Sequence, residues 1–201
     1  MTIYKIGGSL LDLPSLAAVI NHLLARTAPS PALLVVGGGT AAQAVRDWDQ
    51  AHHLGDDAAH DLAMAAMDLT SLLLARLVPK LRPVRSVQQV RMAADDGVVG
   101  LLCADCFIKS SEAQGHSSLE RSWRVTSDSI AAWTSRVIGA PELVLVKSVP
   151  LPVDISLADA ARARLVDEAF PALAQRLPAI GWVNARSQPL LVEHWIGPPA
   201  H

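Results

Sequence analysis

Two short strand-like runs near the start of the chain each end in glycines and lead into a helical pattern. The first run, Thr2–Ile6, ends at Gly7 and Gly8, and the second, Ala32–Val36, ends at the triplet Gly37–Gly39. The second run is apolar at every position, which is typical of a strand buried on both faces of a parallel sheet. Repeated strand–glycine–helix junctions restrict the chain to folds in which strands and helices alternate.

The alternation continues along the chain. Further strands are predicted over 84–91, 98–108, 142–147, 180–184 and 190–195, with a turn at 95–97 and a polar loop over 110–120. Helices are predicted for about fifteen residues from Pro14 and over about 41–51, 58–78, 130–138 and 170–177. This order predicts an α/β fold, in which helices cover both faces of a mostly parallel sheet and ligands bind beyond the carboxyl ends of the strands.

The composition excludes several classes of protein. The chain has 201 residues, of which 51% are hydrophobic and 18% are charged, with a formal net charge of -2. A chain this apolar is not intrinsically disordered, and its net charge does not indicate the basic surface that binds nucleic acid. No uninterrupted apolar run reaches the roughly 18 residues of a membrane-spanning helix, and the N-terminus lacks the pattern of a secretory signal. We therefore expect one cytoplasmic domain over 1–201 that binds neither nucleic acid nor membrane.

Two cysteines, Cys103 and Cys106, form a lone C-x-x-C pair. A zinc site would need two further ligands, and His116 is the sole candidate nearby. A redox motif would place the pair at the start of a helix, whereas here it interrupts the apolar segment 98–108. We therefore expect two reduced thiols in the interior of a cytosolic protein.

Lysine is rare in this chain: only Lys5, Lys80, Lys109 and Lys147 occur among 17 basic residues. Lys5 and Lys147 each end a predicted strand, so both fall on the edge of the sheet where a ligand would bind. They are either solvated strand ends or two ammonium groups that neutralise phosphate oxygens during phosphoryl transfer. Asp128, in the first turn of a predicted helix, is either a helix cap or a carboxylate that holds both lysines in place and charged.

The glycine clusters are either tight turns or anion-binding loops. Glycine lets the backbone present several N–H groups to one side, and the following helix adds its positive N-terminal end. The P-loop pattern is absent, whereas Gly37, Gly39 and Ala42 match the dinucleotide-binding pattern G-x-G-x-x-A. That pattern requires an acidic residue after a second strand. Asp57 has the required spacing but opens a helix, so a dinucleotide site is not favoured.

Three ordered segments, Lys5–Leu10, Val36–Gly39 and Val125–Ala132, together resemble the motifs of the amino acid kinase family. That family includes acetylglutamate, aspartate, carbamate, uridylate and isopentenyl phosphate kinases. The resemblance implies a three-layer α/β/α sandwich on a mainly parallel sheet, here with a shortened C-terminal nucleotide lobe. It also implies ATP and Mg²⁺ as cofactors, with the acceptor bound over about 1–125 and the nucleotide over about 126–201.

The resemblance also implies roles for individual residues. Lys5, Asp128 and Lys147 would be catalytic, with the two lysines stabilising the transferring phosphoryl group and Asp128 organising them. The residues implied to hold the ATP phosphates are Gly7, Gly8 and Ser9. Those implied to lie at the acceptor are Gly37, Gly38, Gly39 and His60. A surface or helix-capping role is the alternative for His60, and no residue is assigned to a metal.

Within the family, His60–Met64, Trp123–Asp128 and Leu145–Val149 are similar to the branch of methanofuran biosynthesis. This similarity implies phosphoryl transfer to [5-(aminomethyl)furan-3-yl]methyl phosphate, which gives the diphosphate. The alternatives are a kinase for another small acceptor, a uridylate or a carboxylate, and a non-catalytic member that binds a nucleotide or an anion. The long apolar helix over 58–78 indicates either a homo-oligomer interface or an internal element.

Overall fold

The structure, a computed structural model, describes residues 1–197 of the chain. Its strands are β1 (Thr2–Ile6), β2 (Ala32–Val36), β3 (Arg82–Val84), β4 (Gly100–Leu102), β5 (Glu142–Lys147), β6 (Ile180–Asn184) and β7 (Glu193–Ile196). Its helices are α1 (Leu16–Thr27), α2 (Gly39–His52), α3 (Asp56–Leu77), α4 (Val87–Asp95), α5 (Ala104–Ala113), α6 (Ser127–Ile138), α7 (Leu157–Arg162) and α8 (Phe170–Ala174), with a short 3₁₀ turn, η1 (Gly8–Leu10).

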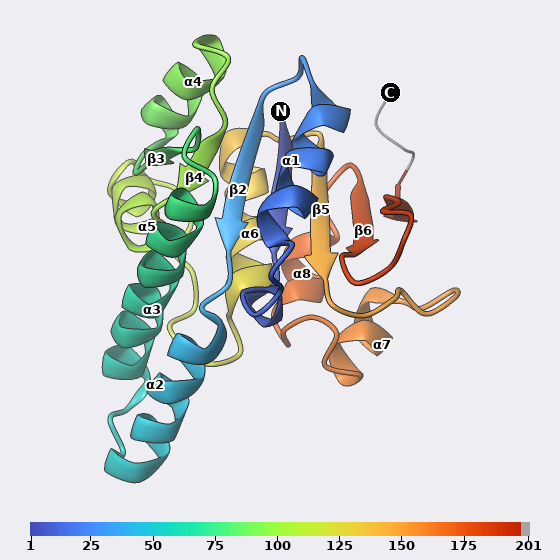
Figure 1. The fold of residues 1–201 in the computed structure, drawn as a ribbon. Helices are drawn as coiled ribbons and strands as arrows, with labels where there is room; N and C mark the ends of the chain where they lie inside the picture. The colour runs from blue at the N-terminus through green and yellow to red at the C-terminus, as the bar shows by residue number, and fades with distance from the viewer. Residues whose placement is uncertain (198–201) are drawn as a thin grey trace.

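The strands form one seven-stranded sheet in the order β3-β4-β2-β1-β5-β6-β7. Neighbouring strands run parallel except for β6 and β7, which are antiparallel. β1 lies between β2 and β5, and Lys5 stands opposite Val35 on one side and Leu145 on the other. The carboxyl ends of these three strands therefore meet at one edge, and α2 projects beyond it (Figure 1). The α/β fold expected from the sequence is confirmed.

Helices cover both faces of the sheet, which gives three layers (Figure 1). On one face, Tyr4 packs in an apolar cluster with Ile20 of α1. On the other face, Ile3 and Leu145 pack in a second cluster with Trp133 of α6. Because side chains alternate along a strand, a strand covered on both faces becomes a continuous apolar run. Between β5 and β6 stand only the short helices α7 and α8, in agreement with a shortened nucleotide lobe.

The strand predicted over 84–91 is wrong. Only its first residue belongs to β3, and α4 follows. Val87, Val90 and Ala93 recur at helical spacing, and their burial against the core stabilises a helix. Ser86 caps its start, where the side chain accepts a backbone hydrogen bond at 3.2 Å. The apolar residues of this segment therefore follow the spacing of a short helix and not that of a strand.

The strand predicted over 98–108 is also wrong, because β4 has only three residues and α5 begins shortly after it. α5 extends to Ala113, into the predicted polar loop. Cys103 is therefore the N-cap residue of α5, and Cys106 lies exposed in its first turn. The pair does stand at the start of a helix, and the expectation that both thiols lie in the interior is wrong. Burial raises the pKa of the half-buried Cys103 thiol, which disfavours its thiolate form.

α3 departs from the expectation that no segment is long and apolar enough to span a membrane. By length and composition alone, α3 is one helix among residues 1–197 that is long and apolar enough to span a membrane, with a mean hydropathy of 1.2 over an 18-residue window. Half of that window is buried inside the protein, and a helix that packs on a core passes the same test.

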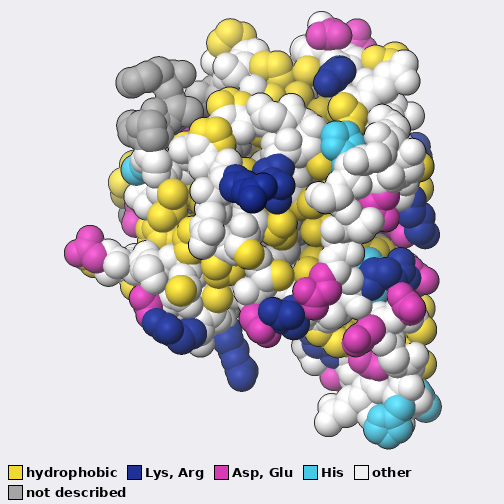
Figure 2. Space-filling model, turned by 180° about the vertical axis from the view of Figure 1, so that it is seen from behind, with side chains coloured by type: hydrophobic (Ala, Val, Ile, Leu, Met, Phe, Trp, Pro, Cys, Tyr) yellow, Lys and Arg dark blue, Asp and Glu magenta, His cyan; other side chains and the backbone are white. Residues whose placement is uncertain are grey.

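On the face in Figure 2, charged side chains of both signs are interspersed rather than gathered into one field.

Candidate functional site

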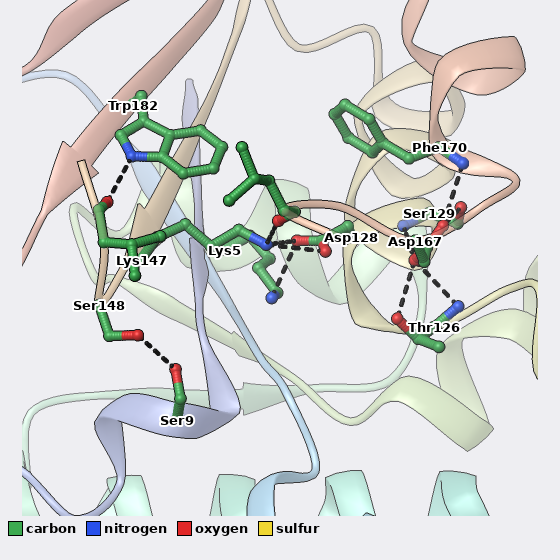
Figure 3. A network of polar contacts seen from close by, with 12 residues as sticks. Lys5, Ser9, Thr126, Asp128, Ser129, Lys147, Ser148, Asp167, Phe170 and Trp182 are labelled. Carbon is green, nitrogen blue, oxygen red and sulfur yellow. Dashed lines mark hydrogen bonds and ion pairs between the residues drawn. The ribbon is translucent and has the colours of Figure 1, made fainter. Parts of the chain in front are cut away.

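Lys5, Lys147 and Asp128 meet at the carboxyl edge of the sheet (Figure 3). The Lys5 Nζ lies 2.9 Å from Asp128 Oδ1, and the Lys147 Nζ lies 2.8 Å from the same oxygen. Oδ1 accepts no well-directed hydrogen bond, so these two contacts are ion pairs. Lys147 also donates a hydrogen bond to Asp128 Oδ2, at 2.8 Å. The three side chains, at most 11% exposed, are called the Lys–Asp–Lys cluster below.

Strand register accounts for this meeting. β1 and β5 pair in parallel, and alternation places Lys5 and Lys147 on the same face as Ile3 and Leu145, which pack against α6. α6 begins beside this face and presents Asp128 in its first turn. The positive end of the helix favours a carboxylate at that position. Three segments that are far apart in the sequence therefore supply one compact group of charges.

Burial and charge oppose each other in the Lys–Asp–Lys cluster. Burial acts to raise the pKa of Asp128, but Lys147 and Lys5 lower it to about 2. Burial lowers the pKa of Lys147 to about 8, although Asp128 acts to raise it. At neutral pH Asp128 is therefore a carboxylate and Lys147 an ammonium group. The cluster joins two basic side chains to one acidic side chain, which suits an anionic ligand.

The two lysines differ in how fully they are held. Lys147 also donates to the Leu165 carbonyl oxygen at 2.8 Å, and its Nζ lies 5.6 Å from the ring centroid of Trp182 in β6. An ammonium group carries three N–H donors, and within residues 1–197 Asp128 is the one acidic partner of Lys5. Lys147 is thus fixed from three sides, whereas Lys5 keeps hydrogen-bonding capacity for a ligand.

The two glycine loops touch each other at this edge. A Cβ added to Gly8 would lie 2.4 Å from the Gly39 nitrogen, and one added to Gly37 would lie 2.9 Å from the Gly8 nitrogen. Gly39 has a φ of +55°, and a Cβ at Gly38 would lie 2.6 Å from a side chain of α2. Gly7 and Gly37 donate their N–H groups to neighbouring strands, at 2.8 and 2.9 Å. Close contact between the loops therefore requires glycine at these positions.

An open cavity of about 960 Å³ adjoins both glycine loops. Its lining includes residues of both loops, Arg186 and apolar side chains of α3. The Ser9 Oγ lies 3.0 Å from the Ser148 Oγ, which joins the loop after β1 to the residue after β5. Arg186 donates to the Ser9 carbonyl oxygen at 3.1 Å and to the Asp12 carboxylate at 2.7 Å. A hydroxyl and a guanidinium, both suited to phosphate oxygens, therefore lie at the first glycine loop.

His60 lies apart from the glycine loops. It is buried near the start of α3 and lines a cavity of about 140 Å³ with Met64 and with Asp105 and Lys109 of α5. Burial, reinforced by the charge of Arg121, lowers the pKa of His60, so its imidazole is neutral at pH 7. The lining of this cavity contains no glycine-loop residue. The structure therefore does not bring His60 together with the other predicted site residues.

Trp123 lies between α2 and the start of α6. Its Nε1 donates to the Asp49 carboxylate at 2.8 Å, and the Arg46 guanidinium lies 4.6 Å from its ring centroid. The indole is half-buried and borders an open cavity of about 590 Å³. An aromatic face paired with a cation is therefore accessible beyond the carboxyl edge of the sheet.

Magnesium has no dedicated protein site within residues 1–197, where no group of three or more His, Cys, Asp or Glu side chains is placed to hold a metal ion. Mg²⁺ commonly keeps several waters and binds through one or two carboxylates together with substrate phosphates. A metal bound in that way needs no cluster of three protein ligands.

Sequence patterns missed three contacts at the site, those of Trp182, Leu165 and Arg186. Trp182 offered a signal, because its predicted strand neighbours the strand that ends at Lys147. Leu165 contributes a backbone carbonyl, which no residue type reveals. Arg186 follows β6 and reaches the first glycine loop only through the tertiary fold.

The chain is similar to known kinases along most of its length. The sequence profile described as the amino acid kinase family matches residues 1–151. The [5-(aminomethyl)furan-3-yl]methyl phosphate kinase of Methanocaldococcus jannaschii is 25% identical over 195 residues, which cover 91% of this chain and 87% of that protein.

Solved structures agree with this match. UMP kinase from Ureaplasma parvum has a TM-score of 0.67 at 14% identity, covering 94% of this chain and 91% of that chain. Uridylate kinase from Archaeoglobus fulgidus has a TM-score of 0.62 at 15% identity, covering 96% and 90%. At such identities the likeness shows the fold, and the profile match shows the family. The chain therefore belongs to the amino acid kinase family and is a phosphotransferase.

Proposed function

We propose that the chain transfers the γ-phosphoryl group of ATP to a small phosphorylated acceptor, and that the Lys–Asp–Lys cluster catalyses this step. The observation that carries the proposal is the burial of two lysines against one carboxylate at the edge where the glycine loops meet. Lysines that merely end strands remain in water, because an ammonium group is rarely buried without a partner. A function that uses the two charges explains why they are buried.

The proposed reaction depends on position and charge. An acceptor phosphate oxygen forms a bond to the γ-phosphorus while the bond to the β–γ bridging oxygen breaks, which yields ADP and a diphosphate. ATP supplies the phosphoryl group, and Mg²⁺ neutralises its phosphate oxygens. Lys5 contacts the transferring group through its remaining N–H donors, and Lys147 balances charge on the leaving side. Asp128 keeps both lysines in place in a buried setting, where their charges act strongly.

In this proposal each of the two glycine loops binds one of the two substrates. Gly7, Gly8 and Ser9 lie at the ATP phosphates, with the nucleotide over the C-terminal part of the chain. Gly8 and Ser9 begin η1, and the first N–H groups of a helical turn lack partners within that turn. Gly37–Gly39 lie at the acceptor, over the N-terminal part. His60 is left out of this acceptor site because it faces α5.

The acceptor that we propose is [5-(aminomethyl)furan-3-yl]methyl phosphate, the substrate in the name of the relative that covers most of the chain. A furan ring is bound by an aromatic or apolar surface, and its phosphate by a cation. Trp123 and Arg46 offer both chemistries beyond the carboxyl edge of the sheet. Both side chains belong to the part of the chain proposed to bind the acceptor.

A further part of the proposal is a cytoplasmic homo-oligomer that associates through α3. Five leucines of this helix are 38–64% exposed: Leu62, Leu69, Leu72, Leu73 and Leu77. Large apolar patches on an otherwise polar surface commonly mark interaction sites. A second copy of the same chain would bury this row, three of whose leucines also line the cavity beside the glycine loops.

The test combines binding with turnover. Calorimetry with ATP and Mg²⁺ measures binding. Phosphorus NMR follows the product in parallel reactions: a diphosphate from the aminomethylfuran phosphate or from UMP, and an acyl phosphate from a carboxylate acceptor. We expect turnover with the furan phosphate and loss of that turnover in Lys5→Ala. Faster turnover of UMP or of the carboxylate would overturn the acceptor assignment. ATP binding without ADP release over the whole panel would indicate a non-catalytic member of the family.

A further inference from the structure

One carboxylate outside the Lys–Asp–Lys cluster accepts five hydrogen bonds (Figure 3). Asp167 lies between α7 and α8. Its Oδ2 accepts from the Thr126 N–H at 3.0 Å, the Thr126 hydroxyl at 2.9 Å and the Ser129 N–H at 2.9 Å. Its Oδ1 accepts from the Ser129 hydroxyl and from the Phe170 N–H, the latter at 3.0 Å. Asp167 thus links the first turn of α6 to the start of α8.

The residues that Asp167 holds are those on either side of Asp128. Thr126 is the N-cap residue of α6, yet its side chain makes no capping bond within the helix. Its hydroxyl instead donates to Asp167, which accepts the backbone N–H groups of this turn in the manner of an N-cap. The orientation of the turn that carries Asp128 therefore depends on a residue far along the chain.

The same segment also reaches the second lysine of the cluster. Two residues before Asp167, the Leu165 carbonyl oxygen accepts a hydrogen bond from Lys147 Nζ at 2.8 Å. A single short segment thus touches both Lys147 and the turn that carries Asp128. A shift of this segment would move one member of the ion pair relative to the other.

We propose that Asp167 is a positioning residue for phosphoryl transfer, because it locks the first turn of α6 and the Leu165 carbonyl into the arrangement that aligns Asp128 with Lys147. The proposal rests on the catalytic role proposed above for the Lys–Asp–Lys cluster. Asp167 itself touches neither glycine loop through any hydrogen bond found in residues 1–197. Its effect on the reaction therefore passes through the cluster.

Asp167→Asn is the direct test. An asparagine replaces one carboxylate oxygen by an NH₂ donor, which cannot accept the hydrogen bonds that converge there. We expect kcat to fall roughly 10- to 100-fold, because small displacements of catalytic groups carry costs of that size, while KM for ATP stays near the wild-type value. Ser129→Ala removes one hydrogen bond to the Asp167 carboxylate, so we expect a smaller fall in kcat. This variant tests the proposal if Asp167→Asn fails to fold.

A matched control separates positioning from general destabilisation. Ser86 caps the start of α4, where its side chain accepts the Gln89 N–H at 3.2 Å, so it supports a helix start as Asp167 does but away from the cluster. Ser86→Ala should lower the thermal unfolding temperature and leave kcat unchanged. An equal loss of kcat in Ser86→Ala and Asp167→Asn would show that both residues act only through stability and would overturn the proposal.

Lysine NMR provides a readout that needs no acceptor. The chain has only four lysines, so the side-chain signals can be assigned by single substitutions. The groups that face Lys147 are Asp128 from α6, Lys5 from β1, Asp167 and the ring of Trp182. In Asp167→Asn the Lys147 signal should move and titrate at lower pH, because a nearby negative charge is lost. An unmoved Lys147 signal in folded Asp167→Asn protein refutes the positioning role of Asp167. Absence of phosphoryl transfer by the wild-type protein refutes the proposed function alone.

Discussion

Asp128→Asn removes the one negative charge between two buried ammonium groups while it keeps the size of the side chain. The two nitrogens lie 2.9 and 2.8 Å from Oδ1 and would lose their counterion. A pKa of about 2, against the ordinary 3.8, corresponds to about 2 kcal/mol of stabilisation of the charged carboxylate. Leaving a buried charge unpaired costs about 3–5 kcal/mol. We therefore expect the free energy of unfolding to fall by about 2–5 kcal/mol at neutral pH.

Lys147 determines how the same substitution affects catalysis. Burial already lowers its pKa to about 8, and Asp128 is the main group that opposes this shift. Without Asp128 the pKa of Lys147 falls further, so the ammonium loses its proton nearer to neutral pH. Removal of one preorganised donor costs about 10²–10³ in kcat. We expect a loss of that size in Asp128→Asn, with partial recovery at lower pH, where Lys147 regains its proton.

The assay follows ADP release from mildly acidic to mildly basic pH, with chemical unfolding measured in parallel. Asp105→Asn is the matched control, because Asp105 pairs with Lys109 at 2.8 Å on the surface, where an ion pair contributes little. The control should keep its kcat and most of its stability. A folded Asp128→Asn protein with kcat within roughly threefold of wild type, or with a loss independent of pH, would refute the reasoning.

In the wild-type protein, kcat should fall as the pH rises past about 8, and a pH–rate profile checks this. Burial lowers the pKa of Lys147 to about 8, and above that pH its amine carries no charge. Gly8→Ala places a Cβ 2.4 Å from the Gly39 nitrogen, so we expect a loss of about 1–3 kcal/mol in stability and weaker ATP binding, measured by unfolding and calorimetry. Leu72→Lys changes a side chain that is 64% exposed, so the chain should still fold while light scattering records a smaller oligomer. An unchanged mass contradicts association through α3.

The elements that carry the site could be predicted because their signals are local. β2 is a continuous apolar run and β1 and β5 are mostly apolar, while glycines follow β1 and β2 and Lys147 ends β5. Parallel strands bring their carboxyl ends to one edge, so Lys5 and Lys147 could be placed there from the sequence. The errors fell on 84–91 and 98–108, where strands of three residues run directly into short helices. Apolar residues in such brief segments fit a strand and a helix equally well.

The sequence by itself determined which residue types stand at the strand ends, and hence the α/β fold and the two lysines at its ligand-binding edge. The tertiary structure alone decided what surrounds them. Trp182 and the Leu165 carbonyl fix Lys147, and Asp167 holds the turn of Asp128, while His60 turns toward α5. These contacts join segments far apart in the chain, and some use backbone groups that every residue carries. Neither spacing nor composition records such a contact, because it exists only once the sheet has brought the segments together.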